Sequence, residues 1–223
     1  MGSWNYHAEG LAADGKIGAR TSSFADISKQ SGDTFLKGTD DRREHVFLKT
    51  VTKLGKTSTL TFVTSYNQQH QNTVQGQTKA QVIEYGPRFG LGNDPSVQNY
   101  TGYNNAAYYS SFNYVGLETS LGEWDLDNKL YYVSFDHWSN KATDASDTDP
   151  THNGVKFYDS TGKKVASADA DVAGKESDSH YHAFGDVLRV QRYIGPGLFK
   201  TGIWIERDIG GQYSLAKDLT TGQ

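Results

Sequence analysis

The chain contains no cysteine, only four prolines and no long apolar run. The absence of cysteine excludes a disulfide scaffold and thiolate metal sites, and it is compatible with any cellular compartment. No segment approaches the ~20 apolar residues that a membrane-spanning helix needs, so the chain is not a helical membrane protein. A charged start followed by an apolar signal region is also missing, as it would be in a mature chain or an internal fragment.

Apolar residues are scarce as well. They make up 35% of the chain and the mean hydropathy is -0.67, which would leave an ordinary globular core thin. Aromatic residues are plentiful instead, with 14 tyrosines, 10 phenylalanines and 4 tryptophans. A transmembrane β-barrel needs such a composition, because lipid covers only one face of each strand and aromatic girdles mark the membrane interfaces. The net charge is -4 and the basic residues are scattered along the sequence. The sequence therefore shows no basic cluster of the kind that binds nucleic acid.

Short and long connections alternate along the chain. The predicted tight turns are Asp14-Gly15, Leu54-Gly55-Lys56, Leu121-Gly122-Glu123 and Gly195-Pro196-Gly197. The predicted long loops run from Lys29 to Asp41, from Gln68 to Asn105 and from Ser139 to Ser179. Outer-membrane barrels show this asymmetry, because their periplasmic turns are short and their external loops are long.

Between these connections the sequence predicts about eight antiparallel strands and no helix. The clearest is Leu198 to Arg207, in which Phe199, Ile203 and Ile205 fall on one face. The expected strands are Ser3–Ala13, Lys16–Ser28, Arg43–Leu54, Lys56–Asn67, Ala106–Leu121, Trp124–Trp138, Phe184–Ile194 and Leu198–Arg207. Several exceed the ~5 to 6 residues usual in globular sheets and would fit a tilted bilayer crossing.

Several stretches then resemble TonB-dependent outer-membrane receptors. They are SWNYH, GDTFLKGTDDRREHVFLKTVTKLG, STLTFVTSYNQQHQN, QVIEYGPRFGLGNDPSVQNYTGYN, NYVGLETSLGEWDLDNKLYYVSFD and GDVLRVQRYIGPGLFKTGIW. The resemblance covers nearly the whole chain and its ordered motifs match the barrel. It implies an all-β fold in which residues 1–223 form a partial, unclosed barrel domain without the plug domain of the family.

The resemblance also implies a location and partners. It places the chain in the cell outer membrane, surrounded by lipid, in energy-coupled uptake of a scarce nutrient such as a ferric siderophore or an oligosaccharide. Contact with the TonB system would run through the missing plug. We expect no transport from residues 1–223 alone, because a sheet with two open edges leaves backbone groups unpaired in lipid.

Some residues could carry chemistry. His180 and His182 alternate on one strand face with Asp186, a spacing that suits a metal, but two polar residues on a strand explain the pattern better. Acids of the last long loop could gather Ca²⁺, although their spacing matches no defined loop and solvation explains them better. These acids are Asp144, Asp147, Asp149, Asp169 and Asp171.

No nucleophile motif, metal-hydrolase motif or phosphate-binding glycine loop occurs, so we expect no enzyme, no metal site and no cofactor. Aromatic and amide groups of the long loops are the better candidates, because they suit stacking and hydrogen bonding of a polar organic ligand. The expected ligand-binding residues are His70, Tyr85, Arg88, Phe89, Tyr100, Tyr103 and Asn104.

Two other classes stay open on sequence alone. A passive porin would be a closed barrel with a constriction loop. A soluble β-sandwich or lectin-like binding module would need two sheets that share an apolar core.

Overall fold

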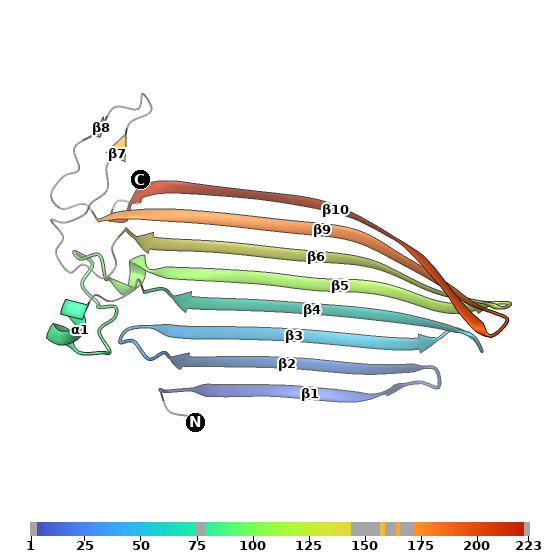
Figure 1. Cartoon of the computed structure of the whole chain (residues 1–223). Helices are drawn as coiled ribbons and strands as arrows, with labels where there is room; N and C mark the ends of the chain where they lie inside the picture. The colour runs from blue at the N-terminus through green and yellow to red at the C-terminus, as the bar shows by residue number, and fades with distance from the viewer. Residues whose placement is uncertain (1–3, 75–78, 144–156, 159–163, 166–171, 221–223) are drawn as a thin grey trace.

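The computed structural model describes residues 4–74, 79–143, 157–158, 164–165 and 172–220. Eight of the strands form one antiparallel sheet in the order β1-β2-β3-β4-β5-β6-β9-β10, so that each of them pairs with the next strand of this sheet along the chain (Figure 1). The strands are β1 (His7–Ile17), β2 (Thr21–Asp33), β3 (Asp40–Lys53), β4 (Ser58–Asn72), β5 (Asn105–Leu121), β6 (Trp124–Ala142), β9 (Ala173–Ile194) and β10 (Gly197–Asp218). The predicted number of strands in the main sheet is confirmed.

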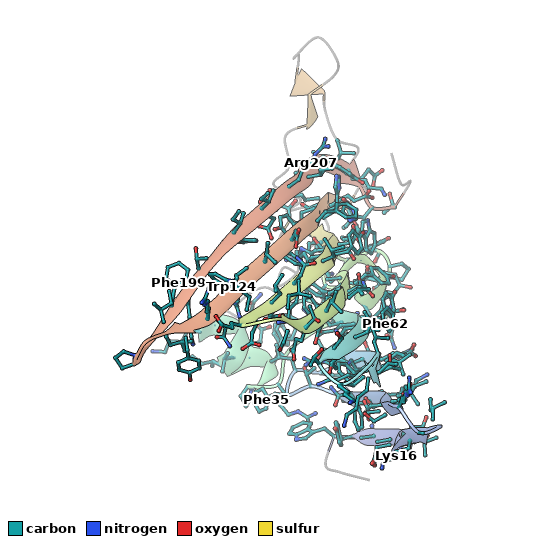
Figure 2. The ribbon with its side chains drawn as sticks, turned by 90° about the vertical axis from the view of Figure 1, so that its right-hand side faces the viewer. Lys16, Phe35, Phe62, Trp124, Phe199 and Arg207 are labelled. Carbon is teal, nitrogen blue, oxygen red and sulfur yellow. The ribbon has the colours of Figure 1, made fainter. Side chains whose placement is uncertain are left out.

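The sheet is open. β1 and β10 are its two edges, and the strands lengthen from 11 residues in β1 to 22 residues in β10. Figure 2 views the sheet from the end that carries the tight turns, and shows that it twists strongly, with β9 and β10 running obliquely across the view while β1 is foreshortened. This arrangement confirms the predicted partial, unclosed antiparallel barrel sheet.

Three of the four predicted tight turns are correct. Leu54-Gly55-Lys56, Gly122-Glu123 and Gly195-Pro196 connect successive strands. The prediction of a turn at Asp14-Gly15 is wrong, because β1 continues through both residues to Ile17. The chain reverses at residues 18–20, where Gly18 has a φ of 70°. Glycine adopts this left-handed conformation without steric cost, so Gly18 rather than Gly15 sets the turn.

The long loops are shorter than predicted, because the strands extend further. β2 and β3 leave only residues 34–39 between them instead of Lys29 to Asp41, and β4 runs on to Asn72. The expectation of no helix is wrong over a short stretch, since the loop 73–104 holds α1 (Lys79–Tyr85) and η1 (Thr101–Tyr103). The last long loop includes the two-residue strands β7 (Phe157–Tyr158) and β8 (Lys164–Val165).

The register gives the sheet two unlike faces, because paired residues of neighbouring strands point to the same side. We call one the apolar face. One representative from each strand is Leu11, Ile27, Val46, Phe62, Val115, Leu130, Phe184 and Ile205. We call the other the polar face. Its representatives are Asp14, Asp26, His45, Ser65, Phe112, Tyr131, Tyr181 and Glu206.

Exposed aliphatic side chains are sorted almost completely between these faces. Leu198 is the one exposed leucine, isoleucine or valine of the described strands that lies on the polar face. Those on the apolar face are Leu11, Ile17, Ile27, Val46, Val115, Leu117, Leu121, Leu130, Ile194, Ile203, Ile205, Ile209 and Leu215. The exposed large apolar residues of the polar face are otherwise aromatic.

A globular core is absent from the described part of the chain. Its buried apolar cluster consists of Ala142, Val172 and Leu219, with Tyr103 packed against it. The only other sheet in the described residues is the β7-β8 pair, so nothing there packs on the main sheet as a sandwich would. Among the described residues, no helix has the length and apolarity to cross a membrane.

Candidate ligand-binding region

The long loop 73–104 is fixed to the neighbouring loop 34–39 by main-chain hydrogen bonds. The Lys37 amide donates to the Arg88 carbonyl at 2.9 Å, and the Leu91 amide donates to the Lys37 carbonyl at 2.7 Å. A Cβ atom at Gly38 or Gly90 would overlap the facing backbone, so both glycines permit this close approach. The part of the loop around residues 88–91 therefore has a defined position at the end of the sheet opposite the tight turns (Figure 1).

Arg88 links the loop 73–104 to the loop 34–39 and to Trp4 near the start of the chain. Its Nε donates to the Phe35 carbonyl at 3.2 Å, and its guanidinium lies 4.3 Å from the centre of the Trp4 ring. Nearby, Tyr85 and Phe89 stack with their ring centres 4.8 Å apart. The Tyr85 side chain is 49% exposed, so this first group of predicted residues offers an aromatic surface.

Tyr100, Tyr103 and Asn104 form a second group at the base of the same loop. Asn104 is fully buried, its Nδ2 donates to the Gln98 and Tyr100 carbonyls at 2.8 and 2.9 Å, and its Oδ1 accepts the Ala142 amide at 3.1 Å. The Tyr100 and Tyr103 rings meet edge to face at 4.9 Å. The Asn104 amide is thus used to hold loop main chain to β6.

Two ionisable groups of this loop have shifted pKa values. Burial raises the pKa of Tyr103, with smaller contributions from Tyr100 and Asp218, and its hydroxyl donates to the Pro95 carbonyl at 2.8 Å. Hydrogen bonds from the Ser96 side chain and amide lower the pKa of Asp94, which lies beside the Tyr103 partner Pro95. Near neutral pH the Tyr103 hydroxyl therefore keeps its proton and the Asp94 carboxyl is ionised. These are the forms that make the hydrogen bonds of the observed loop.

His70 lies apart from both groups. It belongs to the apolar face near the loop end of β4, contacts Gln68 at 2.6 Å, and meets the Tyr109 ring at 5.7 Å. It lines a cavity of about 850 Å³ together with Arg42, Trp138 and loop residues such as Thr101. The structure therefore divides the predicted ligand residues among three places rather than one.

The polar face carries a hydrogen-bonded row that sequence reasoning missed. Gln69 donates to Asp41 and to Gln71, both at 3.0 Å, and Gln71 donates to the Tyr108 hydroxyl at 3.2 Å. His137 stacks on Tyr108 with ring centres 4.3 Å apart. The row crosses β3, β4, β5 and β6 near the loops. Alternation of amides at 67, 69 and 71 in the sequence was the signal that could have revealed it.

His180 and His182 share one face, as their spacing predicts, and this is the apolar face. Their ring centres are 6.1 Å apart, and each has another partner: Asp178 lies 3.5 Å from His180, and the Tyr132 hydroxyl lies 2.9 Å from His182. Asp186 accepts from Asn128 at 2.5 Å. The described residues contain no group of three or more ligands arranged for a metal.

The loop acids that could bind Ca²⁺ lie outside the described residues. They are Asp144, Asp147, Asp149, Asp169 and Asp171.

No protein-family model and no curated protein matches the sequence. Solved structures do match. The ferripyoverdine receptor of the outer membrane of Pseudomonas aeruginosa, bound to ferripyoverdine, is similar to 97% of this chain with a TM-score of 0.59 and 10% identity. The complex of the same receptor type with pyocin S2 covers 97% of this chain with a TM-score of 0.60 and 9% identity.

These matches span 27% and 28% of the receptor chains. The chain therefore spans a little over a quarter of the receptor chains that it matches, and its sheet is similar in fold to that part of them.

Proposed function

We propose that the chain is part of the membrane-spanning barrel of a TonB-dependent outer-membrane receptor that takes up a scarce nutrient. The observation that carries the proposal is the division of the sheet into an apolar and a polar face across all eight strands. In hydrocarbon every backbone group must be paired, and a sheet meets this condition only when it closes into a barrel. The apolar face would meet lipid and the polar face the lumen.

Charges on the apolar face support this orientation. Glu9, Lys29 and Glu44 form one rung, directly on the loop side of Leu11, Ile27 and Val46. The Lys29 ammonium lies 3.1 Å from Glu44. Such a change from aliphatic to charged side chains within two residues is expected where a strand leaves the hydrocarbon for the headgroups. The long loops lie on the far side of this rung.

The edges support membership of a larger barrel. β10 presents 22 residues and β1 only 11, so these two edges do not match each other for closure. Each would pair with another strand of the receptor, which also removes the unpaired edges. Lipid is then a partner, and the TonB system would act through a plug domain of the complete receptor.

The loop end would hold the ligand, a ferric siderophore or an oligosaccharide. The stacked rings of exposed Tyr85 and half-buried Phe89 offer an aromatic surface, and the amide row from Gln69 to Gln71 offers donors and acceptors on the lumen side. The structurally similar receptor of Pseudomonas aeruginosa is bound to ferripyoverdine, which agrees with an organic ligand of this kind. We propose transport and no enzymatic activity for this arrangement.

The test is uptake by cells that produce the complete receptor. Labelled ferric siderophores and oligosaccharides are supplied with and without a protonophore that removes the energy for TonB. We predict that one of them accumulates only in energised cells and that the Tyr85→Ala/Phe89→Ala variant reduces this accumulation. Accumulation that continues after the protonophore would contradict the proposal and favour a passive pore.

A further inference from the structure

A polar cleft lies on the side of the apolar face, where the loop ends of β3 to β6 meet the loops 34–39 and 73–104. Its volume is about 850 Å³, which is within the range of ~300 to 1,000 Å³ for ligand pockets. The strand ends line one side of the cleft, and Asn93, Thr101 and Gly102 of the long loop line the other. The cleft therefore lies in the middle of the sheet and has walls from two parts of the chain.

The register places two aromatic rings at this cleft, on either side of an alanine. Arg42 pairs with His70, His70 with Ala107 and Ala107 with Trp138, so these residues form one rung across β3, β4, β5 and β6. Both His70 and Trp138 line the cleft. The Trp138 indole donates a hydrogen bond to Glu176, so the position of this ring is fixed by the protein itself.

The next rung toward the loops supplies polar groups. Asp40 forms an ion pair with Arg42, whose Nε lies 2.9 Å from the carboxylate. The Arg42 side chain is 67% exposed, and its two Nη groups form no hydrogen bond with the residues that the structure describes. Asn105 donates through Nδ2 to the Gly102 carbonyl at 2.9 Å and, within the same residues, its Oδ1 accepts no hydrogen bond. Donors and acceptors are therefore both left for a ligand.

The charges around the cleft favour an uncharged ligand. Asp33 and Asp40 line it together with Arg42, so a phosphate would meet two carboxylates and an organic cation would meet a guanidinium. A sugar avoids both conflicts, because each hydroxyl group donates and accepts hydrogen bonds, and charged partners strengthen such bonds. The C–H groups of a sugar ring also pack on the apolar face of an aromatic ring.

We propose that this cleft binds a saccharide, with Arg42 and Asp40 holding its hydroxyl groups and the Trp138 ring packed against its C–H groups. The saccharide would belong to a free oligosaccharide or to the head group of a membrane glycolipid. Arg42 and His70 lie one rung further toward the loops than Glu44 and Gln68. Under the proposed orientation of the faces, the cleft thus opens outside the barrel and just beyond the hydrocarbon, apart from the transport path.

The test is binding of the complete receptor to immobilised saccharides in lauryldimethylamine oxide, a detergent that contains no sugar. The array carries neutral oligosaccharides of glucose, galactose and mannose, and the dephosphorylated core oligosaccharide of lipopolysaccharide. Each saccharide that binds is then titrated in solution by calorimetry. We expect at least one to bind, and to bind about tenfold more weakly to Arg42→Gln, because charge-assisted hydrogen bonds are lost. Trp138→Leu, which removes the ring, should also weaken binding.

The matched control is Arg43→Gln. Arg43 is the next residue of β3 and forms the same kind of ion pair, with Asp41 at 2.9 Å, but on the polar face. This variant should bind the saccharide as the wild type does. The gel mobility of heated and unheated samples shows whether each variant is folded.

The binding pattern also separates the two sources. Binding of the core oligosaccharide alone would identify a membrane glycolipid, and binding of the other oligosaccharides would identify a soluble saccharide. Absence of binding to the wild type would overturn the proposal, as would equal affinities of the wild type and folded Arg42→Gln, or equal losses in Arg42→Gln and Arg43→Gln. The measurement needs no energised cells, so its result is independent of the uptake test.

Discussion

At the scale of single residues, Asn104 shows how a side chain that looks suited to ligand chemistry also serves the fold. Its amide suggested ligand binding in the sequence, whereas the structure places it fully buried between loop carbonyls and the Ala142 amide. Burial could not be predicted, because it depends on a loop path of some thirty residues with no periodic pattern. The Tyr85 ring, by contrast, is exposed and stacks on the half-buried Phe89 ring.

We predict that Asn104→Ala loosens the loop. The change removes the hydrogen bonds of the Asn104 side chain to the Gln98 and Tyr100 carbonyls and to the Ala142 amide, which costs about 2 kcal/mol. Hydrogen exchange of the Ala142 amide and of the amides at 98–104 should then be roughly thirtyfold faster. Asn67→Ala is the control, because its amide makes only a 3.5 Å contact with Ser110. Unchanged exchange in Asn104→Ala would show that the loop is held elsewhere.

A second prediction concerns Tyr103 and alkaline pH. The folded state raises the pKa of this phenol, so the folded state holds the proton more tightly than the unfolded state does. Its contribution to stability is fully present below the unfolded pKa of about 10 and is lost as the pH rises through the folded pKa. Ultraviolet titration of wild type and Tyr103→Phe should reveal one late-titrating phenol in the wild type that is missing from the variant.

At the scale of elements, alternation of side chains predicted the strands and three of four turns, because a period of two is imposed by the backbone itself. Strand ends were predicted less well. β9 begins at Ala173 rather than Phe184, and β10 ends at Asp218 rather than Arg207. These added stretches are rich in polar residues, and a polar strand segment cannot be told from a loop by its composition. Asp14-Gly15 resembles a hairpin dipeptide, yet Gly18 lies only three residues further and takes the left-handed conformation.

The corrected turn gives a third prediction. Gly18→Val forces a β-branched residue into the left-handed region and should lower the free energy of unfolding by about 1 to 2 kcal/mol. Gly15→Val should be nearly neutral, because Gly15 lies in β1 with no atom within 4 Å of an added Cβ. Urea unfolding of both variants of the complete receptor decides the matter. A larger loss of unfolding free energy in Gly15→Val than in Gly18→Val would indicate that the turn lies at Asp14-Gly15.

At the scale of the whole molecule, the two faces decide what surrounds the sheet. The sequence predicted an apolar face for a clear strand such as Leu198–Arg207, whereas the face that meets lipid stayed open in strands of mixed character. The register shows that the apolar faces of all eight strands lie on the same side of the sheet. The three separate positions of the predicted ligand residues could not be foreseen, because they depend on how the loops dock on each other through Lys37 and Leu91. The family resemblance indicates where such loops occur in the sequence, but it does not predict their conformations.

The fourth prediction places a charge on each face. Phe62→Arg puts a guanidinium on the apolar face and should destabilise the barrel in lipid by about 2 to 4 kcal/mol. Thr61→Arg places it on the polar face and should change stability little. Folding into vesicles, followed by the gel mobility of heated and unheated samples, measures both. Equal effects of the two substitutions would mean that lipid does not cover the apolar face.

The most direct measurement of the central claim, a barrel that spans the outer membrane with its long loops outside, is cysteine labelling. The chain has no native cysteine, so Glu84→Cys on α1 and Lys56→Cys in a tight turn each carry a unique thiol in this segment. A membrane-impermeant maleimide is added to intact cells that produce the complete receptor. We predict labelling of Glu84→Cys in intact cells and of Lys56→Cys only after lysis. Labelling of both in intact cells, or of Lys56→Cys alone, would contradict it.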